Sequence, residues 1–152
     1  FNNNIYGMTG GQSSPTTPTG KSTTTAPYGT VDRVLDACRI AEAAGATYVA
    51  RSTAFHVKHL AQMIAGGLQN HGFSLIEAIV QCPTAYGRRN KMGSPAQMLA
   101  WMRDAAVMKN AWDKLPPENR TPEKFPIGLL YECAGEEYGM ANAEIQRRAG
   151  GL

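Results

Sequence analysis

Ser74-Leu75-Ile76-Glu77-Ala78-Ile79-Val80-Gln81 is a nearly continuous apolar stretch, and it decides the fold class. Such a run predicts a strand that is buried on both faces, as in parallel sheets. Residues 47–51 predict an earlier short strand, and a helical pattern capped by Thr53 and ending at Gly72 lies between the two. Strand, helix and strand in this spacing form a βαβ unit with a right-handed crossover. We therefore predict an α/β fold with a doubly wound, mostly parallel sheet and flanking helices.

Further elements are predicted on either side of this unit. A first helix is predicted from Thr30, as its N-cap, to a stop at Gly45. Its apolar stripe consists of Val31, Val34, Leu35, Cys38 and Ala41. A third helix is predicted from a cap at Ser94 to about Lys114. An extended proline-rich stretch, a strand over residues 127–131 and a terminal helix over residues 136–148 follow.

Bulk properties bound the class of protein. The chain has 152 residues, enough for one domain with a core, with 43% hydrophobic and 18% charged residues. A formal charge of +3 does not suggest a nucleic-acid partner, and no apolar run approaches membrane-spanning length. Three unevenly spaced cysteines indicate reduced thiols, so we expect a cytoplasmic protein without a disulfide framework.

The first twelve residues are polar and rich in glycine. Gly7, Gly10 and Gly11 allow the backbone to come close to a ligand, because glycine has no Cβ. Asn3 offers a side-chain oxygen and Ile5 a carbonyl, and hard cations such as Mg²⁺ take oxygens of this kind. Composition alone favours a polar surface turn.

The order of residues in Asn-Asn-Asn-Ile-Tyr-Gly-Met-Thr-Gly-Gly-Gln, followed by Ser-Pro-Thr-Thr, closely resembles a known loop. It is similar to the metal and diphosphate loop in the β subunits of 2-oxoacid:ferredoxin oxidoreductases, which use thiamine diphosphate. The resemblance continues through residues 45–51, 71–74 and 82–88 and thins after about Asn90. It implies a thiamine-diphosphate-binding fold, present here as a partial domain. We expect residues 1–90 to form the C-terminal half of that domain and residues 91–152 a helical and extended extension.

The resemblance also implies roles for single residues. Asn3 and Ile5 would supply a side-chain and a main-chain oxygen to Mg²⁺, and Gly7, Met8 and Thr9 would lie against the cofactor. Some family members carry at the position of Gly10 a lysine that approaches the substrate carboxylate. The family holds its metal with a further Gly-Asp-Gly segment a few tens of residues upstream. No such segment precedes Asn3 here, so we interpret the chain as the C-terminal part of a longer polypeptide.

Three cysteines have different expected roles. Cys82 follows a predicted parallel strand, at the edge where open α/β sheets bind ligands. A lone cysteine there is usually a small buried hydrophobe. The family places at this Cys-Pro-Thr the last of four ligands to a [4Fe-4S] cluster, so the resemblance implies a metal-ligand role for Cys82, with the other ligands outside this chain. Cys38 is expected in the core, and Cys133 has no assigned role.

Other candidate motifs are weaker. Gly20-Lys21-Ser22 lacks the earlier glycine of a P-loop, because Pro15 stands there. The histidines at 56 and 59 could bind a metal but lack the glutamate of a His-Glu-x-x-His motif, so polar contacts are expected. Residues 88–91 form a basic loop that could contact an acidic partner or a CoA phosphate, or could simply be solvated. Five large apolar residues have helical spacing, and we expect them in the core or in a subunit interface: Met98, Trp101, Met102, Met108 and Trp112.

The implied function is oxidative decarboxylation of a 2-oxo acid, 2-oxoglutarate by preference, to its acyl-CoA in anaerobic metabolism. Cofactors would be thiamine diphosphate, Mg²⁺ and a [4Fe-4S] cluster. Partners would be CoA, ferredoxin, an α subunit and small γ or δ subunits, with no nucleic acid and no membrane. The activating acid is expected on the α subunit, so no catalytic acid–base residue is predicted here. Alternatives are a cluster-free thiamine decarboxylase or lyase, a branched-chain acid or pyruvate as substrate, and a non-catalytic binding domain.

Overall fold

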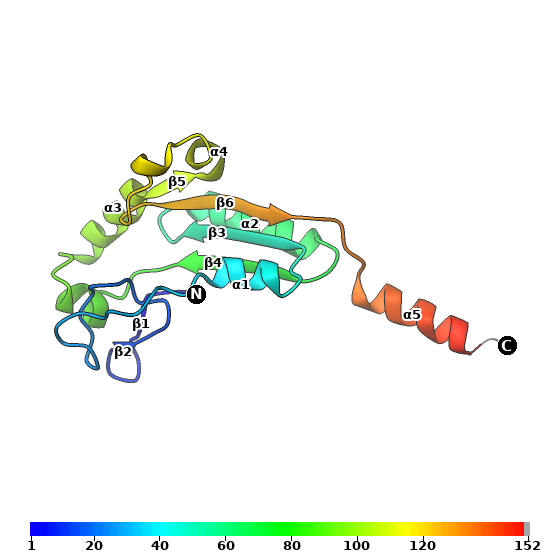
Figure 1. Cartoon of the computed structure of the whole chain (residues 1–152), viewed down its shortest axis with the longest axis horizontal. Coiled ribbons are helices and arrows are strands. Elements are labelled where there is room, and N and C mark those ends of the chain that lie inside the picture. The colour runs from blue at the N-terminus through cyan, green and yellow to red at the C-terminus, as the bar shows by residue number, and fades with distance from the viewer. Residues whose placement is uncertain (151–152) are drawn as a thin grey trace.

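The computed structural model describes residues 1–150. A small hairpin opens the chain, a four-stranded sheet with helices forms its body, and a single helix ends it (Figure 1). In chain order the elements are β1 (Ile5–Tyr6), β2 (Gln12–Ser13), α1 (Ala37–Ala43), β3 (Tyr48–Thr53), α2 (Val57–Gln69), β4 (Ser74–Ile79), the π-helical turn η1 (Pro83–Gly87), α3 (Pro95–Ala105), β5 (Ala106–Met108), α4 (Lys109–Trp112), the 3₁₀ turn η2 (Pro117–Asn119), β6 (Phe125–Glu132) and α5 (Tyr138–Ala149).

The sheet has the order β4-β3-β6-β5. Strands β3 and β4 are parallel and joined by α2, which confirms the predicted βαβ unit. Strands β5 and β6 are also parallel, whereas β6 runs antiparallel to β3, so the sheet is mixed. β4 pairs with β3 along its whole length and on its other side forms one bridge, from Ile79 to Asn2. This bridge attaches the opening segment to the sheet.

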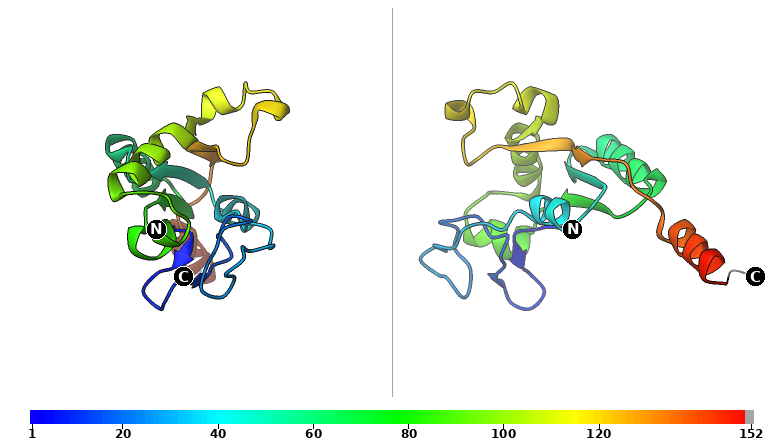
Figure 2. Two further views of the ribbon diagram at one scale, coloured as in Figure 1. Left: turned by 90° about the vertical axis from the view of Figure 1, so that its left-hand side faces the viewer. Right: turned by 45° about the vertical axis from the view of Figure 1, so that its right-hand side comes forward.

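Helices cover both faces of the β3–β4 pair. Because strand residues alternate between faces, neighbouring residues of β3 meet different helices. Val49 packs with Cys38 and Ala41 of α1, whereas the Tyr48 hydroxyl donates to the Met63 carbonyl of α2 at 3.0 Å. The rotated views show the same layering of helix, sheet and helix (Figure 2).

The predicted first helix begins later than expected. Val31, Val34 and Leu35 are exposed, and α1 starts after Asp36, whose carboxylate accepts from the backbone of Cys38 at 3.1 Å. Thr30 instead pairs with Lys21 in a loop, so the prediction of Thr30 as cap was wrong. The predicted stop is confirmed, because Gly45 directly follows the C-cap with a φ of +88°.

Two other helices also differ at their ends. α2 begins after His56 rather than at a Thr53 cap and ends at Gln69, before Gly72. α3 has the predicted Ser94 capping box but ends at Ala105, because the chain then extends to pair with β6. β4 is fully buried only over its second half, so burial on both faces holds only for that half.

The end of the chain projects from the body. After β6, which confirms the predicted strand, an extended segment carries α5 away from the sheet (Figure 1). Glu137 caps this predicted helix by accepting from the Met140 backbone at 2.8 Å. Among the residues that the structure describes, no helix is long and apolar enough to cross a membrane.

Candidate functional site

The opening loop is a hairpin held against the carboxyl end of β4. Ile5, which is almost fully buried, packs with Cys82, Tyr86 and Met98 in a small apolar cluster. This contact supplies the apolar anchor of an otherwise polar segment. The loop and Cys82 therefore lie at the same edge of the sheet, as predicted from the parallel strand order.

The two predicted metal donors are neighbours within this loop. The Asn3 side-chain oxygen accepts from the Ile5 N–H at a long 3.4 Å, and the Ile5 carbonyl accepts from Gly7 at 3.1 Å. Each oxygen thus keeps a lone pair for a further partner. Both residues line a cavity of about 370 Å³ that also includes Tyr6 and Thr16.

The glycines of the loop line a second cavity, of about 470 Å³. Gly10 and Gly11 have φ values of +121° and +87°, a backbone that side chains rarely allow. The cavity is lined by Gly7, Gly10, Gly11, Thr84, Ala85, Arg88 and Arg89. Glycine backbone and two exposed guanidinium groups around one cavity suit an anionic ligand.

Met8 and Thr9 lie at the tip of the hairpin. Met8 is fully exposed, and the Thr9 hydroxyl donates to Gln12 Oε1 at 2.7 Å. The structure therefore places Gly7, but neither of these two, in the lining of the larger cavity. Their contact with a cofactor stays a prediction.

Cys82 is buried directly under Gly7. A Cβ on Gly7 would lie 3.1 Å from the Cys82 sulfur, so only glycine fits comfortably here. Burial raises the pKa of the Cys82 thiol, but N–H groups of Tyr86 and Ala85 and the Thr84 hydroxyl more than offset it, and the net pKa is lowered. Hydrogen bonds that favour the thiolate are what a metal-ligating or reactive cysteine requires.

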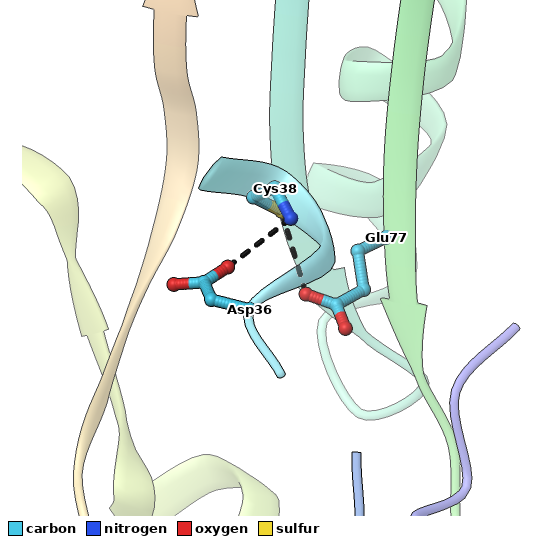
Figure 3. A group of neighbouring side chains, drawn as sticks. All are labelled: Asp36, Cys38 and Glu77. Carbon is cyan, nitrogen blue, oxygen red and sulfur yellow. Dashed lines mark hydrogen bonds between the residues drawn. The ribbon is translucent and has the colours of Figure 1, made fainter. Parts of the chain in front are cut away.

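A second cluster joins α1 to β4 (Figure 3). One ligand atom from each of Asp36, Cys38 and Glu77 lies within 4.8 Å of the others. Arg51 already pairs with both carboxylates, with Nε 2.6 Å from Glu77 and Nη2 2.8 Å from Asp36. Burial raises the pKa of the Cys38 thiol to about 12, so this cysteine is a neutral core residue, as predicted, and the cluster is a charge network.

Sequence reasoning missed this network. Arg51 and Glu77 are register partners in the parallel pair and are each only 9% exposed. A charged residue inside an otherwise apolar strand was the available signal, since charges are almost never buried without a partner. Two strands that each carry one such residue, of opposite sign, indicate an ion pair.

The remaining candidates make structural contacts. His59 and His56 bond through Nδ1 to Ser52 and Thr53 at 2.8 Å, as expected for polar contacts. Burial, and then His59, lower the pKa of His56. Lys21 of the rejected P-loop lies in an irregular loop, in agreement with that rejection.

The residues of the predicted basic loop and of the methionine stripe differ in their burial and contacts. Asn90 of the basic loop fixes the backbone of Ser22 through two hydrogen bonds. Met98 and Met102 are core residues, whereas Met108 is half exposed and Cys133 is exposed.

Comparisons with known proteins show the family of the chain. Residues 1–78 match the family model for "Thiamine pyrophosphate enzyme, C-terminal TPP binding domain". The 2-oxoglutarate synthase subunit KorB of Methanothermobacter marburgensis is 51% identical over 145 residues, which covers 92% of this chain and 50% of that protein. The subunit of the same name from Methanocaldococcus jannaschii is 53% identical over 138 residues, covering 91% and 51%. The chain thus spans about half the length of the curated relatives it matches.

The fold has a counterpart among solved structures. The 2-oxoglutarate:ferredoxin oxidoreductase from Magnetococcus marinus, solved with 2-oxoglutarate, coenzyme A and succinyl-CoA bound, superposes with a TM-score of 0.72 and 28% identity. The superposition covers 97% of this chain and 50% of that one, which confirms the α/β fold. The chain therefore belongs to the thiamine pyrophosphate enzymes, through their C-terminal TPP-binding domain, and within them to the β subunits of the 2-oxoacid:ferredoxin oxidoreductases.

Proposed function

We propose that this chain is the metal- and diphosphate-holding part of a β subunit that oxidatively decarboxylates 2-oxoglutarate. 2-Oxoglutarate and CoA would give succinyl-CoA and carbon dioxide, and two electrons would leave singly through a [4Fe-4S] cluster to ferredoxin. The carrying observation is the hairpin loop, which presents two neutral oxygens beside one cavity and three glycines to the next. The choice of 2-oxo acid follows the names of the relatives.

The loop suits its share of a magnesium site. Mg²⁺ binds one or two carboxylates together with phosphate oxygens and waters. Asn3 and Ile5 offer neutral oxygens, so negative charge would come from the diphosphate and from a carboxylate elsewhere in the enzyme. Thiamine diphosphate, when bound, supplies the carbon nucleophile for the 2-oxo carbon and accepts the electrons left by carbon dioxide.

The cavity walls support binding of anions. Gly7, Gly10 and Gly11 let an anionic ligand approach the backbone, and Arg88 and Arg89 add positive charge to the lining of the same cavity. The chain would therefore bind and orient charged groups rather than move protons. The activating acid, and the proposed contacts with ferredoxin and with γ or δ subunits, would lie outside this site, and an α subunit would complete it. We retain the boundary near residue 90 and the cytoplasmic location as proposals.

Cys82 is proposed as one ligand of the cluster. The lowered pKa of its thiol and its place beside Gly7 support a thiolate at this edge of the sheet. The remaining three ligands would come from the rest of the enzyme.

Binding of the cofactor tests the proposal most directly. Asn3→Ala in the complete subunit, purified with its partner subunits, should weaken Mg²⁺-dependent retention of thiamine diphosphate by at least about 10-fold, because one metal ligand is lost. Asn119→Ala is the matched control, since Asn119 is exposed and lies in the distant turn η2. Equal retention by Asn3→Ala and wild type would remove the loop from the site.

A second measurement separates the cluster-bearing enzyme from a cluster-free thiamine decarboxylase. The wild-type complex should contain four iron atoms and four acid-labile sulfides at the Cys82 site, and Cys82→Ser should lower both contents together. The wild-type complex should also reduce ferredoxin with 2-oxoglutarate and CoA as substrates. Iron and sulfide contents that Cys82→Ser leaves unchanged would refute the ligand role.

A further inference from the structure

Glu77 is joined to the proposed metal loop through one side chain, that of Asn2. We propose that Glu77 is a positioning residue: it fixes the orientation of the Asn2 amide, which in turn holds Asn3 and Ile5 ready for Mg²⁺. This inference rests on the proposed function of the loop. It assigns a role to a buried carboxylate that lies outside the metal-binding motif.

The Asn2 amide bonds at both of its ends. Its Nδ2 donates to Glu77 Oε1 at 2.7 Å. Its Oδ1 accepts from the Asn4 backbone at 3.0 Å and from the Thr16 hydroxyl at 2.9 Å. The bond to Asn4 closes an Asx turn, and Asn3 is the residue inside that turn.

The Asx turn matters because Asn4 has an unusual backbone. Its φ is +63°, a left-handed conformation that residues other than glycine adopt infrequently. Two bonds hold it there, from its N–H to Asn2 and from the Thr17 hydroxyl to its carbonyl at 2.6 Å. Without the bond from its N–H to Asn2, Asn4 could leave the left-handed conformation, and the Ile5 carbonyl would then change direction.

A carboxylate selects one of the two amide orientations. Glu77 only accepts hydrogen bonds, so the NH₂ group of Asn2 must face it. The amide oxygen is then directed at the Asn4 N–H. The reverse orientation would set oxygen against oxygen at Glu77 and donor against donor at Asn4.

Glu77 is itself held firmly. Its second oxygen accepts from Arg51 Nε at 2.6 Å, and Asp36 binds the other end of that guanidinium at 2.8 Å. The Asn2 N–H donates to the Ala78 carbonyl, and the Val80 N–H donates to the Asn2 carbonyl. These two bonds fix the backbone from which the Asn2 side chain extends. The orientation of the Asn2 amide is therefore determined by the core of the sheet.

The isosteric variant Glu77→Gln tests whether Glu77 sets the orientation of the Asn2 amide. In Glu77→Gln the new amide would turn its oxygen to Arg51, which only donates, and its NH₂ group to Asn2. Asn2 would then reverse and lose its bond to Asn4. An isosteric change in the sheet should therefore act on the loop as strongly as removal of the Asn2 side chain does.

The test uses the complete subunit in its assembled enzyme, stripped of metal and cofactor. Mg²⁺ is titrated in the presence of saturating thiamine diphosphate by calorimetry, and the melting temperature is recorded in parallel. Asn2→Ala and Glu77→Gln should each raise the Mg²⁺ dissociation constant by roughly 10-fold, the size found when groups that hold metal ligands are removed. The double variant should be no weaker than Asn2→Ala alone.

Asp36→Asn is the matched control. It removes the charge that pairs with the same guanidinium and can still cap α1, and within residues 1–150 no hydrogen bond or ion pair joins the Asp36 side chain to the loop. It should leave the Mg²⁺ dissociation constant unchanged. Wild-type affinity in either Asn2→Ala or Glu77→Gln, or an equal loss in Asp36→Asn, would overturn the inference. If Glu77→Gln does not fold, Asn2→Asp tests the same link, because it keeps an acceptor for the Asn4 N–H but loses the donor to Glu77, and wild-type Mg²⁺ affinity in it would overturn the inference. A wild-type enzyme without Mg²⁺-dependent cofactor binding would instead refute the proposed function, and this inference with it.

Discussion

Removal of the Arg51 guanidinium is expected to destabilise the fold strongly. Arg51 and Glu77 lie side by side in the parallel pair, and their side chains are 10% and 9% exposed. A methionine at position 51 would fill a similar volume but would leave the Glu77 carboxylate buried with only neutral partners, the Asn2 amide and the Cys38 thiol. The loss therefore comes from an uncompensated buried charge rather than from a cavity.

The magnitude follows from the two ion pairs of Arg51. Breaking a buried pair by removing one partner costs about 3–5 kcal/mol. The pair with Asp36 is partly exposed, at 40% for the carboxylate, and adds no more than about 1 kcal/mol. A total near 4 kcal/mol lowers the melting temperature of a domain of this size by roughly 10 °C.

Thermal unfolding followed by circular dichroism measures the effect, with Arg103→Met as control. Arg103 pairs with Asp104 on the surface, so its loss should leave the melting temperature unchanged. Glu77→Gln provides a sharper check. Alone it should destabilise, because Arg51 loses its buried partner, whereas in the Arg51→Met background it should stabilise, because it removes the unpaired charge. The same sign in both backgrounds would refute the reasoning.

Two other predictions concern the core. Burial raises the pKa of Cys38 from 9.0 to about 12, so the unfolded chain loses this proton first and stability should fall between about pH 9 and 12. The free energy of unfolding should change by at most about 1.4 kcal/mol per pH unit. Urea unfolding of Cys38→Ala should lack this pH dependence, and a profile identical to that of the wild type would contradict the raised pKa of Cys38. Gly87→Ala would place a methyl group against the Met98 sulfur and should lower the free energy of unfolding by about 1–3 kcal/mol. Met98→Ala should cost less stability in that background than in the wild type, because the collision is then absent, and an equal cost in both would exclude the collision.

The sequence predicted elements wherever local pattern and tertiary pairing agree. The βαβ unit, the strand at β6 and the capping box of α3 are such cases. The first helix was placed wrongly because Val31, Val34 and Leu35 have helical spacing, yet the Leu35 N–H is committed to Pro15. Long-range hydrogen bonds of this kind override a local period, and a single sequence does not display them.

For the candidate site, the sequence indicated the residues of the loop motif but not the residues of the sheet that support the loop. The motif predicted Asn3, Ile5 and Gly7 as site residues, because the chemistry of a metal loop depends on residue type and order. It did not identify Glu77 or Arg51, because the support of a loop depends on residues distant in the sequence that the fold brings together, such as Glu77, 75 positions after Asn2. A motif thus specifies what a loop can bind, and the sheet below it decides how it is held.

The threonine-rich segment after the loop shows how a site with little apolar core can still be ordered. Thr17 and Thr23 are almost completely buried although both side chains are polar. The Thr17 hydroxyl donates to the Asn4 carbonyl, and the Thr23 hydroxyl bonds to that of Ser13 at 2.6 Å. Neutral hydroxyl groups satisfy the loop backbone without adding charge that would compete with a cation or a diphosphate. A loop ordered in advance loses less conformational freedom on binding, so more of the interaction with the proposed metal would remain as affinity.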